Sequence, residues 1–404
     1  MVKVAIMGFG TVGSGVYEIL RKNAKSIAKK ANQEIDIKYI LDIRDFDDHP
    51  EKNLFTKDFN DILNDDEVGV VAEVMGGLHP AYEFTKSLLE KGKNVVTSNK
   101  ELVATYGAEL LKIAEENNVN YMFEASVGGG IPVIRPLHQC LTANEVNKIL
   151  GILNGTTNYI LTQMIKAGKS FEEALSDAQA KGYAERNPAA DVEGHDACRK
   201  IAILASLASG KTVDYSKILT EGITKITLED VKYAAQMGYV IKLIGYAELN
   251  NDGKVFARVS PMFIPNESPL ASVEDVFNAI MIKGDCVGDV MFYGRGAGKL
   301  PTASAVVADV IDSVKHINTN KHIVWKDSNE DFLINADDAV VEYFVRTTAG
   351  KDEVTNVLPD VNFVDSDIVK GETAFVTSAA KEGEIKAKLD EIGGVISAIR
   401  VLGE

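Results

Sequence analysis

The apolar positions in the first 130 residues fall into short runs that alternate with amphipathic segments. The runs are partly β-branched, as in buried strands, whereas the segments between them repeat apolar residues at helical spacing. The predicted strands are 2–7, 35–43, 68–75, 94–98 and 119–127, and the predicted helices are 14–30, 81–93 and 101–118. Strands and helices that alternate in this way form βαβ units around a parallel sheet. We therefore predict an α/β fold, with a doubly wound, Rossmann-type nucleotide-binding domain over residues 1–130.

The pattern changes after three consecutive glycines at 128–130. A connecting helix is predicted at 131–142, a strand that leads into a helix at 147–164, and mainly helices from 171 to 245. Residues 246–264 read as a hairpin, because two apolar segments flank the turn residues Asn251, Asp252 and Gly253. We predict an α+β substrate domain over 131–316, whose amphipathic helix at 302–316 returns to the first domain.

The C-terminal part reads as a small α+β unit. A polar linker is predicted at 317–337 and the unit itself at 338–404, with a helix at 381–393. Its strands are predicted at 340–347, 373–378 and 395–402. So few strands cannot bury both faces of a sheet, and isolated small sheets are marginal in water. We expect this unit to pair with a second subunit, so that the protein is at least a dimer.

The composition of the chain indicates which kinds of binding partner and which cellular compartment to expect. The chain has 404 residues and a net charge of −16, which disfavours binding to nucleic acid or to an anionic membrane. No apolar run approaches the roughly 18–20 residues of a membrane span, and the N-terminus enters a strand without a signal-peptide pattern. The three cysteines are widely spaced and form no CxxC pair, so we expect a cytoplasmic protein.

A glycine motif lies between the first strand and the first helix. Gly8, Gly10 and Gly13 form G-x-G-x-x-G, whose backbone amides can hold a pyrophosphate at the positive end of the helix. The end of the second strand offers two different groups to the adenosine ribose. Asp42 could bind a 2′-hydroxyl, as in NAD sites, whereas Arg44 could bind the 2′-phosphate of NADP. We keep both cofactors and favour NADP.

The segment 182–200 has the highest density of reactive groups. Asp196 and Lys200 are one helical turn apart and precede a stretch that is apolar on all sides, which is typical of a buried helix. The alternative is an ordinary ion pair on the protein surface. A lysine near a helix N-terminus has a lowered pKa and suits proton transfer, and clustered carboxylates suit a substrate ammonium group.

Several strings together resemble homoserine dehydrogenase. They are GFGTVG (8–13), TSNKELVA (97–104), FEASVGGGIPVI (123–134), LNGTTNYI (153–160), GYAERNPAADVEGHDACRK (182–200) and YGRGAGKLPTASAVVAD (293–309). The resemblance spans residues 1–316. The final unit is similar to an ACT domain, the small-molecule regulatory module often appended to this family, although its first helix is missing or shortened.

The resemblance implies roles for individual residues. Catalytic residues would be Lys200, as proton donor to the aldehyde oxygen, and Lys100. Substrate-binding residues would be Glu185, Asp191, Asp196, Thr156 and Gly182. Cofactor-binding residues would be Gly8, Phe9, Gly10, Thr11, Val12, Gly13, Arg44, Gly76, Ser98, Lys100, Gly296 and Gly298. A sodium site would use Glu124, Val127, Gly129 and Ile131, with a buried hinge acid as the alternative reading of Glu124.

The expected function is therefore the NAD(P)H-dependent, reversible reduction of L-aspartate 4-semialdehyde to L-homoserine in threonine, methionine and isoleucine biosynthesis. Two alternatives remain at this stage: another amino-acid dehydrogenase of similar architecture, and a catalytically idle, nucleotide-sensing regulator. We expect a homodimer or homotetramer, with threonine as a candidate effector of the ACT-like unit.

Overall fold

A six-stranded parallel sheet forms the centre of the N-terminal region of the computed structural model, which describes residues 1–328, 331–364 and 368–403. The strands are β1 (Val2–Met7), β2 (Ile35–Leu41), β3 (Phe55–Thr56), β4 (Val68–Glu73), β5 (Asn94–Thr97) and β6 (Tyr121–Met122). Their order is β3-β2-β1-β4-β5-β6, so the direction of succession reverses between β1 and β4. This arrangement confirms the predicted Rossmann-type sheet.

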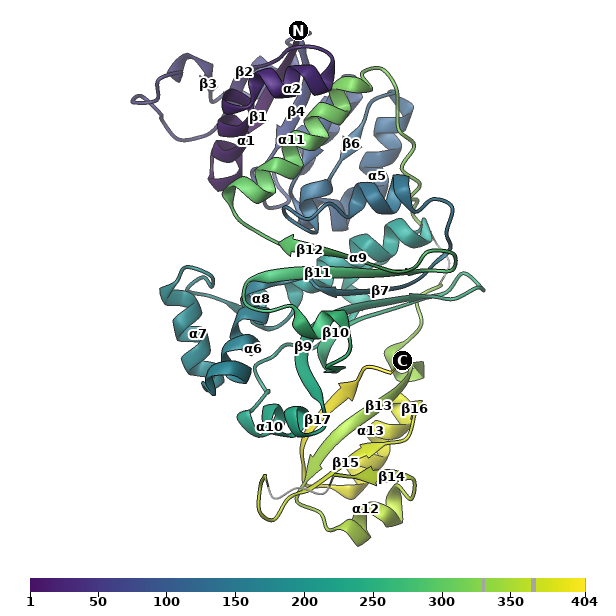
Figure 1. Ribbon diagram of the computed structural model, residues 1–404. Coiled ribbons are helices and arrows are strands. Elements are labelled where there is room, and N and C mark those ends of the chain that lie inside the picture. Colours follow the sequence, from purple (N-terminus) through teal and green to yellow (C-terminus); the bar gives the residue numbers. More distant parts are fainter. Residues whose placement is uncertain (329–330, 365–367, 404) are drawn as a thin grey trace. The chain divides into compact units, whose positions relative to one another are not determined.

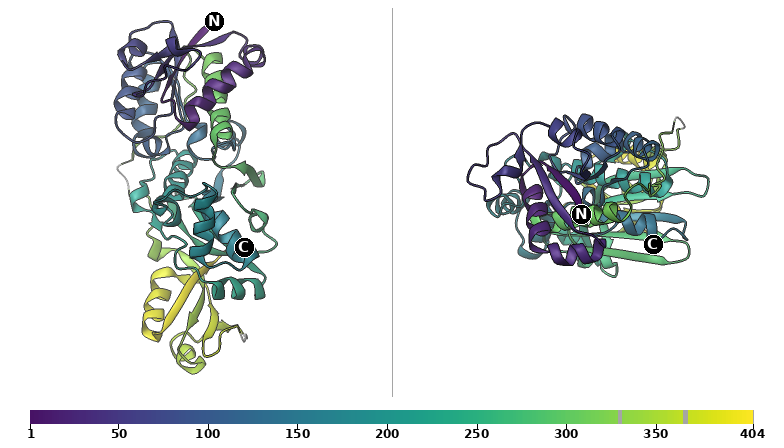
Figure 2. Two further views of the ribbon diagram at one scale, coloured as in Figure 1. Left: turned by 90° about the vertical axis from the view of Figure 1, so that its left-hand side faces the viewer. Right: turned by 90° about the horizontal axis from the view of Figure 1, so that it is seen from above.

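The helices of this region follow from the amphipathic segments. They are α1 (Thr11–Lys22), α2 (Ala24–Ala31), α3 (Asn60–Leu63), α4 (Ala81–Glu90), α5 (Lys100–Glu116) and α11 (Lys299–Lys315). The single helix predicted at 14–30 is wrong in one respect, because the helix is interrupted at Asn23, which has φ −104° and ψ 14°. The late helix α11 lies beside α1 in all views (Figures 1 and 2).

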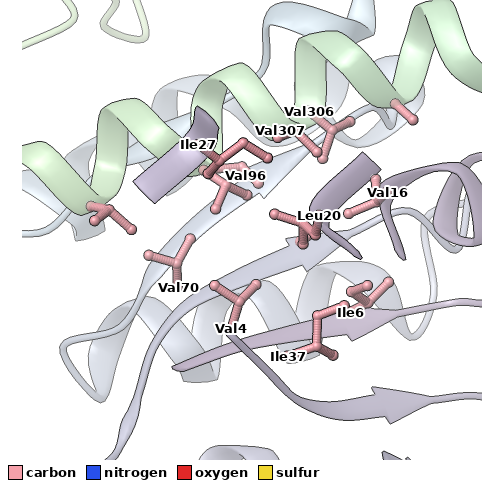
Figure 3. Close-up of a cluster of buried hydrophobic side chains, with 14 of the residues drawn as sticks. Val4, Ile6, Val16, Leu20, Ile27, Ile37, Val70, Val96, Val306 and Val307 are labelled. Carbon is pink, nitrogen blue, oxygen red and sulfur yellow. The ribbon is translucent and has the colours of Figure 1, made fainter. Parts of the chain in front are cut away.

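Apolar side chains that lie about 300 residues apart in the sequence share one core. Val16 and Leu20 of α1 pack with Val306 and Val307 of α11 over the sheet residues, of which Val4 is a central one (Figure 3). All of these side chains are at most 4% exposed. Because burial of an apolar side chain contributes roughly 1.5–3 kcal/mol, α11 is held firmly to the sheet.

The contacts divide the chain into two compact units. The first comprises 1–145, 202–214 and 292–330, and the second comprises 146–201, 215–291 and 331–404. The predicted domain boundaries, which place the first domain at 1–130, stay a prediction. Residues 329 and 330 of the predicted linker lie outside the described part of the chain.

The second unit is built on a mixed sheet with the order β12-β11-β7-β9-β10-β17-β13-β15-β14. Its strands before the tail are β7 (Val146–Ile152), β8 (Leu219–Thr220), β9 (Tyr239–Leu249), β10 (Val255–Pro265), β11 (Phe277–Gly284) and β12 (Gly288–Arg295). The pairing of β9 with β10 confirms the predicted hairpin. The hairpin begins at Tyr239, where helix was predicted to continue to 245, and the strands β11 and β12 were not predicted.

Before the tail, the second unit contains four α-helices, and a fifth, α9, begins in this unit and continues into the first. They are α6 (Gly155–Ala167), α7 (Phe171–Ala180), α8 (Ala189–Val192), α9 (His195–Ser209) and α10 (Leu228–Gln236). The loop before α6 ends at Asn154, whose side chain accepts a hydrogen bond from the Thr157 amide and so caps the helix. The predicted change from strand to helix over 147–164 is confirmed by β7 and α6.

The C-terminal tail extends this sheet instead of forming a separate one. Its elements are β13 (Val340–Thr347), α12 (Lys351–Val357), β14 (Val361–Phe363), β15 (Thr373–Thr377), β16 (Ala380–Lys381), α13 (Glu382–Ile392) and β17 (Val395–Val401). Strand β17 runs parallel to β10, with Met262 opposite Arg400 and Phe263 opposite Val401. The premise that the tail sheet stands alone is therefore wrong, because one of its edges pairs within the same chain.

Two predicted elements around the glycine triplet differ from the structure. Only Tyr121–Met122 of the strand predicted at 119–127 is extended, and a 3₁₀ turn follows at Glu124–Ser126. The helix predicted at 131–142 is a five-residue π-helix, Pro136–Cys140. Both departures follow from Glu124, which folds back on the amides of the next segment, as described below. Among the described helices, none combines the length and apolar character needed to cross a membrane.

Candidate active site

The glycine loop after β1 fits a pyrophosphate. Gly8 has a φ of +94°, and a Cβ on Gly13 would lie 1.9 Å from the carbonyl oxygen of Gly8, so both positions require glycine. Around Gly10, by contrast, a Cβ would meet no atom within 4 Å. Gly10 is the N-cap of α1 and offers no side-chain cap, so the first helical amides, those of Thr11 and Val12, can face a phosphate.

Asp42 and Arg44 occupy different positions at the end of β2. The carboxylate of Asp42 accepts a hydrogen bond from the Phe9 amide at 2.7 Å. It also accepts two hydrogen bonds from the Arg44 guanidinium, each at 2.9 Å, in a bidentate arrangement. These bonds, that of the Arg44 side chain above all, hold the pKa of Asp42 well below its usual range. The Asp42 side chain is 7% exposed and that of Arg44 is 57% exposed. Asp42 thus fastens the glycine loop, and Arg44 presents the accessible charge.

The other predicted cofactor residues of the first unit lie in loops at the carboxyl ends of strands. Gly76 follows β4 with a φ of +80°, and Ser98 follows β5. Lys100 is the first residue of α5, directly after the N-cap Asn99. Gly298 is the N-cap of α11. In open α/β sheets, ligands bind outside the carboxyl ends of the strands, so these positions suit a cofactor.

Glu124 is a buried acid whose carboxylate is already committed. Its oxygens accept the amides of Val133 at 2.6 Å and of Ile134 and Arg135 at 2.8 Å. Its own amide donates to Asp309, which also binds the Arg135 guanidinium. Burial raises the pKa of Asp309 to about 7. The carboxylate of Glu124 therefore binds the start of the next segment to the turn at Glu124–Ser126.

The glycine triplet packs directly on the loop before α11. A Cβ on Gly129 would lie 2.2 Å from the carbonyl oxygen of Gly296, and the Gly130 amide donates to the Arg295 carbonyl at 3.1 Å. The backbone approach of these two loops leaves no room for side chains. Gly129 of the predicted sodium site therefore lies next to Gly296 of the predicted cofactor site.

The second unit brings Asp196 and Lys200 together at the start of α9. The Lys200 ammonium donates to the Asp196 carboxylate at 2.7 Å and to the Leu153 carbonyl at 2.8 Å. The side chain of Lys200 is 10% exposed and that of Asp196 is 8% exposed. The alternative reading as a surface ion pair is therefore wrong, because both charges are largely removed from water. The two hydrogen bonds hold the ammonium group in one direction, which is a geometry that general acid–base chemistry requires.

Asn154 joins a second acid to this pair. Its amide nitrogen donates to Asp191 at 2.7 Å and to Asp196 at 3.0 Å. Burial raises the pKa of Asp191, and the nearby charge of Asp196 adds to the effect. Asn154 was not among the predicted site residues, although it lies in the string LNGTTNYI and directly precedes a helix, which is the signal of a capping residue.

The remaining predicted substrate residues are less closely associated. The Thr156 hydroxyl lies near this group and donates to the Tyr183 carbonyl at 2.7 Å. Gly182 and Glu185 lie in the exposed loop after α7, where the Glu185 carbonyl accepts a hydrogen bond from Gln179. The structure therefore unites Asp191, Asp196 and Lys200, but it does not bring the carboxylate of Glu185 into their hydrogen-bond network.

Comparison with known proteins extends these observations. A family model for homoserine dehydrogenase matches residues 132–311, and a model for the NAD binding domain of homoserine dehydrogenase matches residues 8–124. The homoserine dehydrogenase of Bacillus subtilis is 42% identical over 320 residues, which cover 78% of this chain and 73% of that protein. The chain belongs to the homoserine dehydrogenase family.

Solved structures of homoserine dehydrogenases support the same conclusion. The Thiobacillus denitrificans enzyme superposes with a TM-score of 0.91 at 35% identity, over 99% of this chain and 98% of that one. A hyperthermophilic archaeal homoserine dehydrogenase in complex with NADPH gives a TM-score of 0.66 at 28% identity, over 77% of this chain and 97% of that one. The predicted fold class and the predicted oxidoreductase activity are thereby confirmed.

Proposed function

We propose that Lys200 donates the proton that completes the reduction of L-aspartate 4-semialdehyde to L-homoserine. The observation that carries this proposal is the buried position of the Lys200 ammonium between Asp196 and the Leu153 carbonyl. A nicotinamide cofactor, when bound, supplies the hydride. Lys200 protonates the aldehyde oxygen as charge develops on it, and the network of Asp196 and Asn154 keeps the ammonium aimed. We assign Lys100, at the start of α5, a supporting catalytic role.

The test is oxidation of L-homoserine with NADP, followed by absorbance at 340 nm. We expect Lys200→Ala to lower kcat by about 10²–10⁴ with cofactor affinity near wild type, because a positioned general acid contributes that much. Lys217→Ala, an exposed lysine of the same unit, is the matched control. A Lys200→Ala enzyme that keeps more than a tenth of wild-type kcat would show that another group donates the proton.

The carboxylates beside Lys200 would hold the ammonium group of the substrate. Asp191 and Asp196 are joined through Asn154, and Thr156 lies next to them at the start of α6. Charge-assisted hydrogen bonds to carboxylates are about twice as strong as neutral ones, which suits recognition of an amino acid. Glu185 and Gly182 would contribute from the adjacent loop.

NADP is the cofactor that the end of β2 favours. The exposed guanidinium of Arg44 is available to a 2′-phosphate, whereas the Asp42 carboxylate that would bind a 2′-hydroxyl is occupied by Arg44 and the Phe9 amide. The archaeal relative is described in complex with NADPH. These observations support NADP, with NAD as the second choice.

A sodium ion would be held by backbone oxygens. With its carboxylate bound to three amides, Glu124 would offer its carbonyl, together with those of Val127, Gly129 and Ile131. Hard oxygen ligands suit an alkali cation, and the described part of the chain contains no cluster of His, Cys, Asp and Glu that could hold a metal. The ion would order the loop that joins β6 to the second unit.

The tail at 338–404 is proposed as an ACT-like regulatory domain, for which threonine is the candidate effector. The five strands β13–β17 together with α12 and α13 support the assignment. Because α12 has only seven residues, we expect weak inhibition by threonine. If millimolar threonine does not change the activity of the enzyme, the tail has only a structural role. We also place the protein in the cytoplasm, since Cys140, Cys198 and Cys286 form no disulfide.

A homodimer or homotetramer is the proposed assembly. Strand β12 is one of the two outermost strands of the large sheet, and Met291 and Tyr293 on it are 38% and 53% exposed. An exposed apolar edge strand is a ready site for pairing with another chain. We propose that this edge, instead of the tail alone, contributes to assembly.

A further inference from the structure

The mechanism leaves one buried acid of the first unit without a role. Glu73 is the last residue of β4, and it is 0% exposed. No salt bridge of the described chain ends on it, so its charge would be balanced by neutral donors only. Burial raises the pKa of Glu73, and hydrogen bonds from Thr97 and Met75 oppose this effect. A buried acid without a cation is costly to keep, so its contacts call for an explanation.

Those contacts go to the two loops that leave neighbouring strands. One oxygen of Glu73 accepts the amide of Met75 at 2.8 Å, in the turn that follows β4. The other accepts the hydroxyl of Thr97, at the end of β5, at 2.6 Å. Glu73 and Thr97 are also direct partners in the parallel pairing of the two strands. The carboxylate therefore fixes both loops to each other at the edge where they leave the sheet.

Asn99 completes the connection. Its amide donates to the Thr97 hydroxyl at 2.9 Å, and its side-chain nitrogen donates to the Gly77 carbonyl at 2.6 Å. Its side-chain oxygen caps α5 by accepting the Leu102 amide at 3.1 Å. The position of the first residue of α5, Lys100, thus depends on a chain of bonds that begins at Glu73.

The strand order tells which half of a dinucleotide these loops would meet. A dinucleotide lies across the point where the order reverses, which here is between β1 and β4. The glycine loop after β1 takes the pyrophosphate, and Arg44 after β2 lies on the adenosine side. The loops after β4 and β5 therefore lie on the nicotinamide side.

We infer that Glu73 is a positioning residue for the nicotinamide half of the cofactor, acting by holding the 74–77 turn and the start of α5 in one arrangement. This inference rests on the proposed function, because it requires that a nicotinamide dinucleotide binds at this sheet edge. The role differs from that of a core residue, since it concerns only one half of the ligand.

The experiment compares a whole cofactor with a fragment that lacks the nicotinamide. Dissociation constants of NADPH and of 2′,5′-ADP are measured by calorimetry for wild type and Glu73→Gln. The glutamine removes the charge and places an amide donor on one side. Against the Met75 amide the hydrogen bond is lost, and against the Thr97 hydroxyl its direction must reverse, so the turn shifts in either case. We expect the constant for NADPH to rise about tenfold or more, and that for 2′,5′-ADP to stay within about twofold.

Variants of Thr97 keep the inference testable if Glu73→Gln does not fold. Thr97→Val removes the hydroxyl that joins Glu73 to Asn99 and should weaken NADPH in the same selective way. Thr97→Ser keeps the hydroxyl and should restore the wild-type constant. Equal weakening of NADPH and the fragment, or no weakening of either, would overturn the inference.

The proposed function is tested separately with the wild-type enzyme. If wild type oxidises L-homoserine with NADP, and Glu73→Gln and Thr97→Val bind NADPH as wild type does, only the inference fails. If wild type shows no turnover with either NADP or NAD, the proposed function fails, whatever the Glu73 variant does.

Discussion

Asp191 and Glu185 were predicted as equivalent ligands of the substrate ammonium, yet their surroundings differ. Asp191 lies in the hydrogen-bond network of Asn154, Asp196 and Lys200, whereas Glu185 lies in an exposed loop. A charge that is removed from water contributes more to binding than one that is solvated.

We therefore expect Asp191→Asn to raise the KM for homoserine about tenfold or more, and Glu185→Gln to change it by less than about threefold. Initial rates at saturating NADP give both values. Thermal unfolding of the two variants is the control for folding. If the KM of Asp191→Asn is unchanged while its melting temperature falls, Asp191 is a structural acid.

Arg44 tests the choice of cofactor at the same scale. Arg44→Ala removes the exposed guanidinium at the end of β2, and it also frees Asp42 to bind a ribose hydroxyl. We expect the KM for NADP to rise by about tenfold and that for NAD to change little or fall. The measurement is a pair of saturation curves with the two cofactors. An equal rise for both would show that Arg44 does not meet the 2′-phosphate.

At the scale of elements, most strands and helices of the first 118 residues could be predicted, because apolar periodicity and strand length carry that information locally. The short elements β3 and α3 and the break at Asn23 were not predicted. The turn after Tyr121 could not be predicted, since it depends on Glu124 binding amides nine to eleven residues ahead. The same limit applies to the site. Sequence placed Asp196 and Lys200 on one face, but the contributions of Leu153, Asn154 and Glu73 arise from contacts between separate elements.

The tail is joined to the rest of the second unit by buried ion pairs. Glu382, the first residue of α13, binds Arg258 of β10 at 2.9 Å and also binds Arg400 of β17. Glu382 is 0% exposed, and Arg400 is 1% exposed. Removing one partner of such a pair leaves the other charge buried and costs about 3–5 kcal/mol.

Glu382→Gln should therefore lower the free energy of unfolding by about 3 kcal/mol or more, measured with urea at pH 7. Glu384→Gln, two residues further along the same helix, is the control, because its side chain belongs to none of these pairs. A loss below about 1 kcal/mol would mean that the pairs hardly stabilise the tail.

The same acid gives a pH dependence. Burial alone would raise the pKa of Glu382, but its hydrogen bonds and charge contacts with Arg400 prevail and lower it to about 2. Its pKa in the unfolded chain is about 4.3, so the unfolded state binds the proton first as the pH falls. The stabilisation from Glu382 is thus complete above about pH 5 and is lost between about pH 4 and pH 2. In Glu382→Gln, this part of the acid destabilisation should be absent from the pH profile of unfolding.

At the scale of the whole molecule, pairing of β17 with β10 changes the argument for assembly. Sequence alone left the small tail sheet in need of a partner, and a second subunit was the expected one. The structure supplies that partner within the chain, so the tail no longer requires a dimer. The outer strands of the large sheet are β12 and β14, and on β12 exposed apolar residues alternate with half-buried ones.

If β12 contributes to assembly, a charge on it should separate the subunits. Met291→Lys together with Tyr293→Lys places two cations on this edge, and lysines on edge strands prevent pairing with other chains. Light scattering should then give the mass of a monomer, or half the wild-type mass. Ile396→Lys, at an exposed apolar position of β17, is the control for added charge and should keep the wild-type mass. If the double variant keeps that mass and the control loses it, assembly runs through the tail.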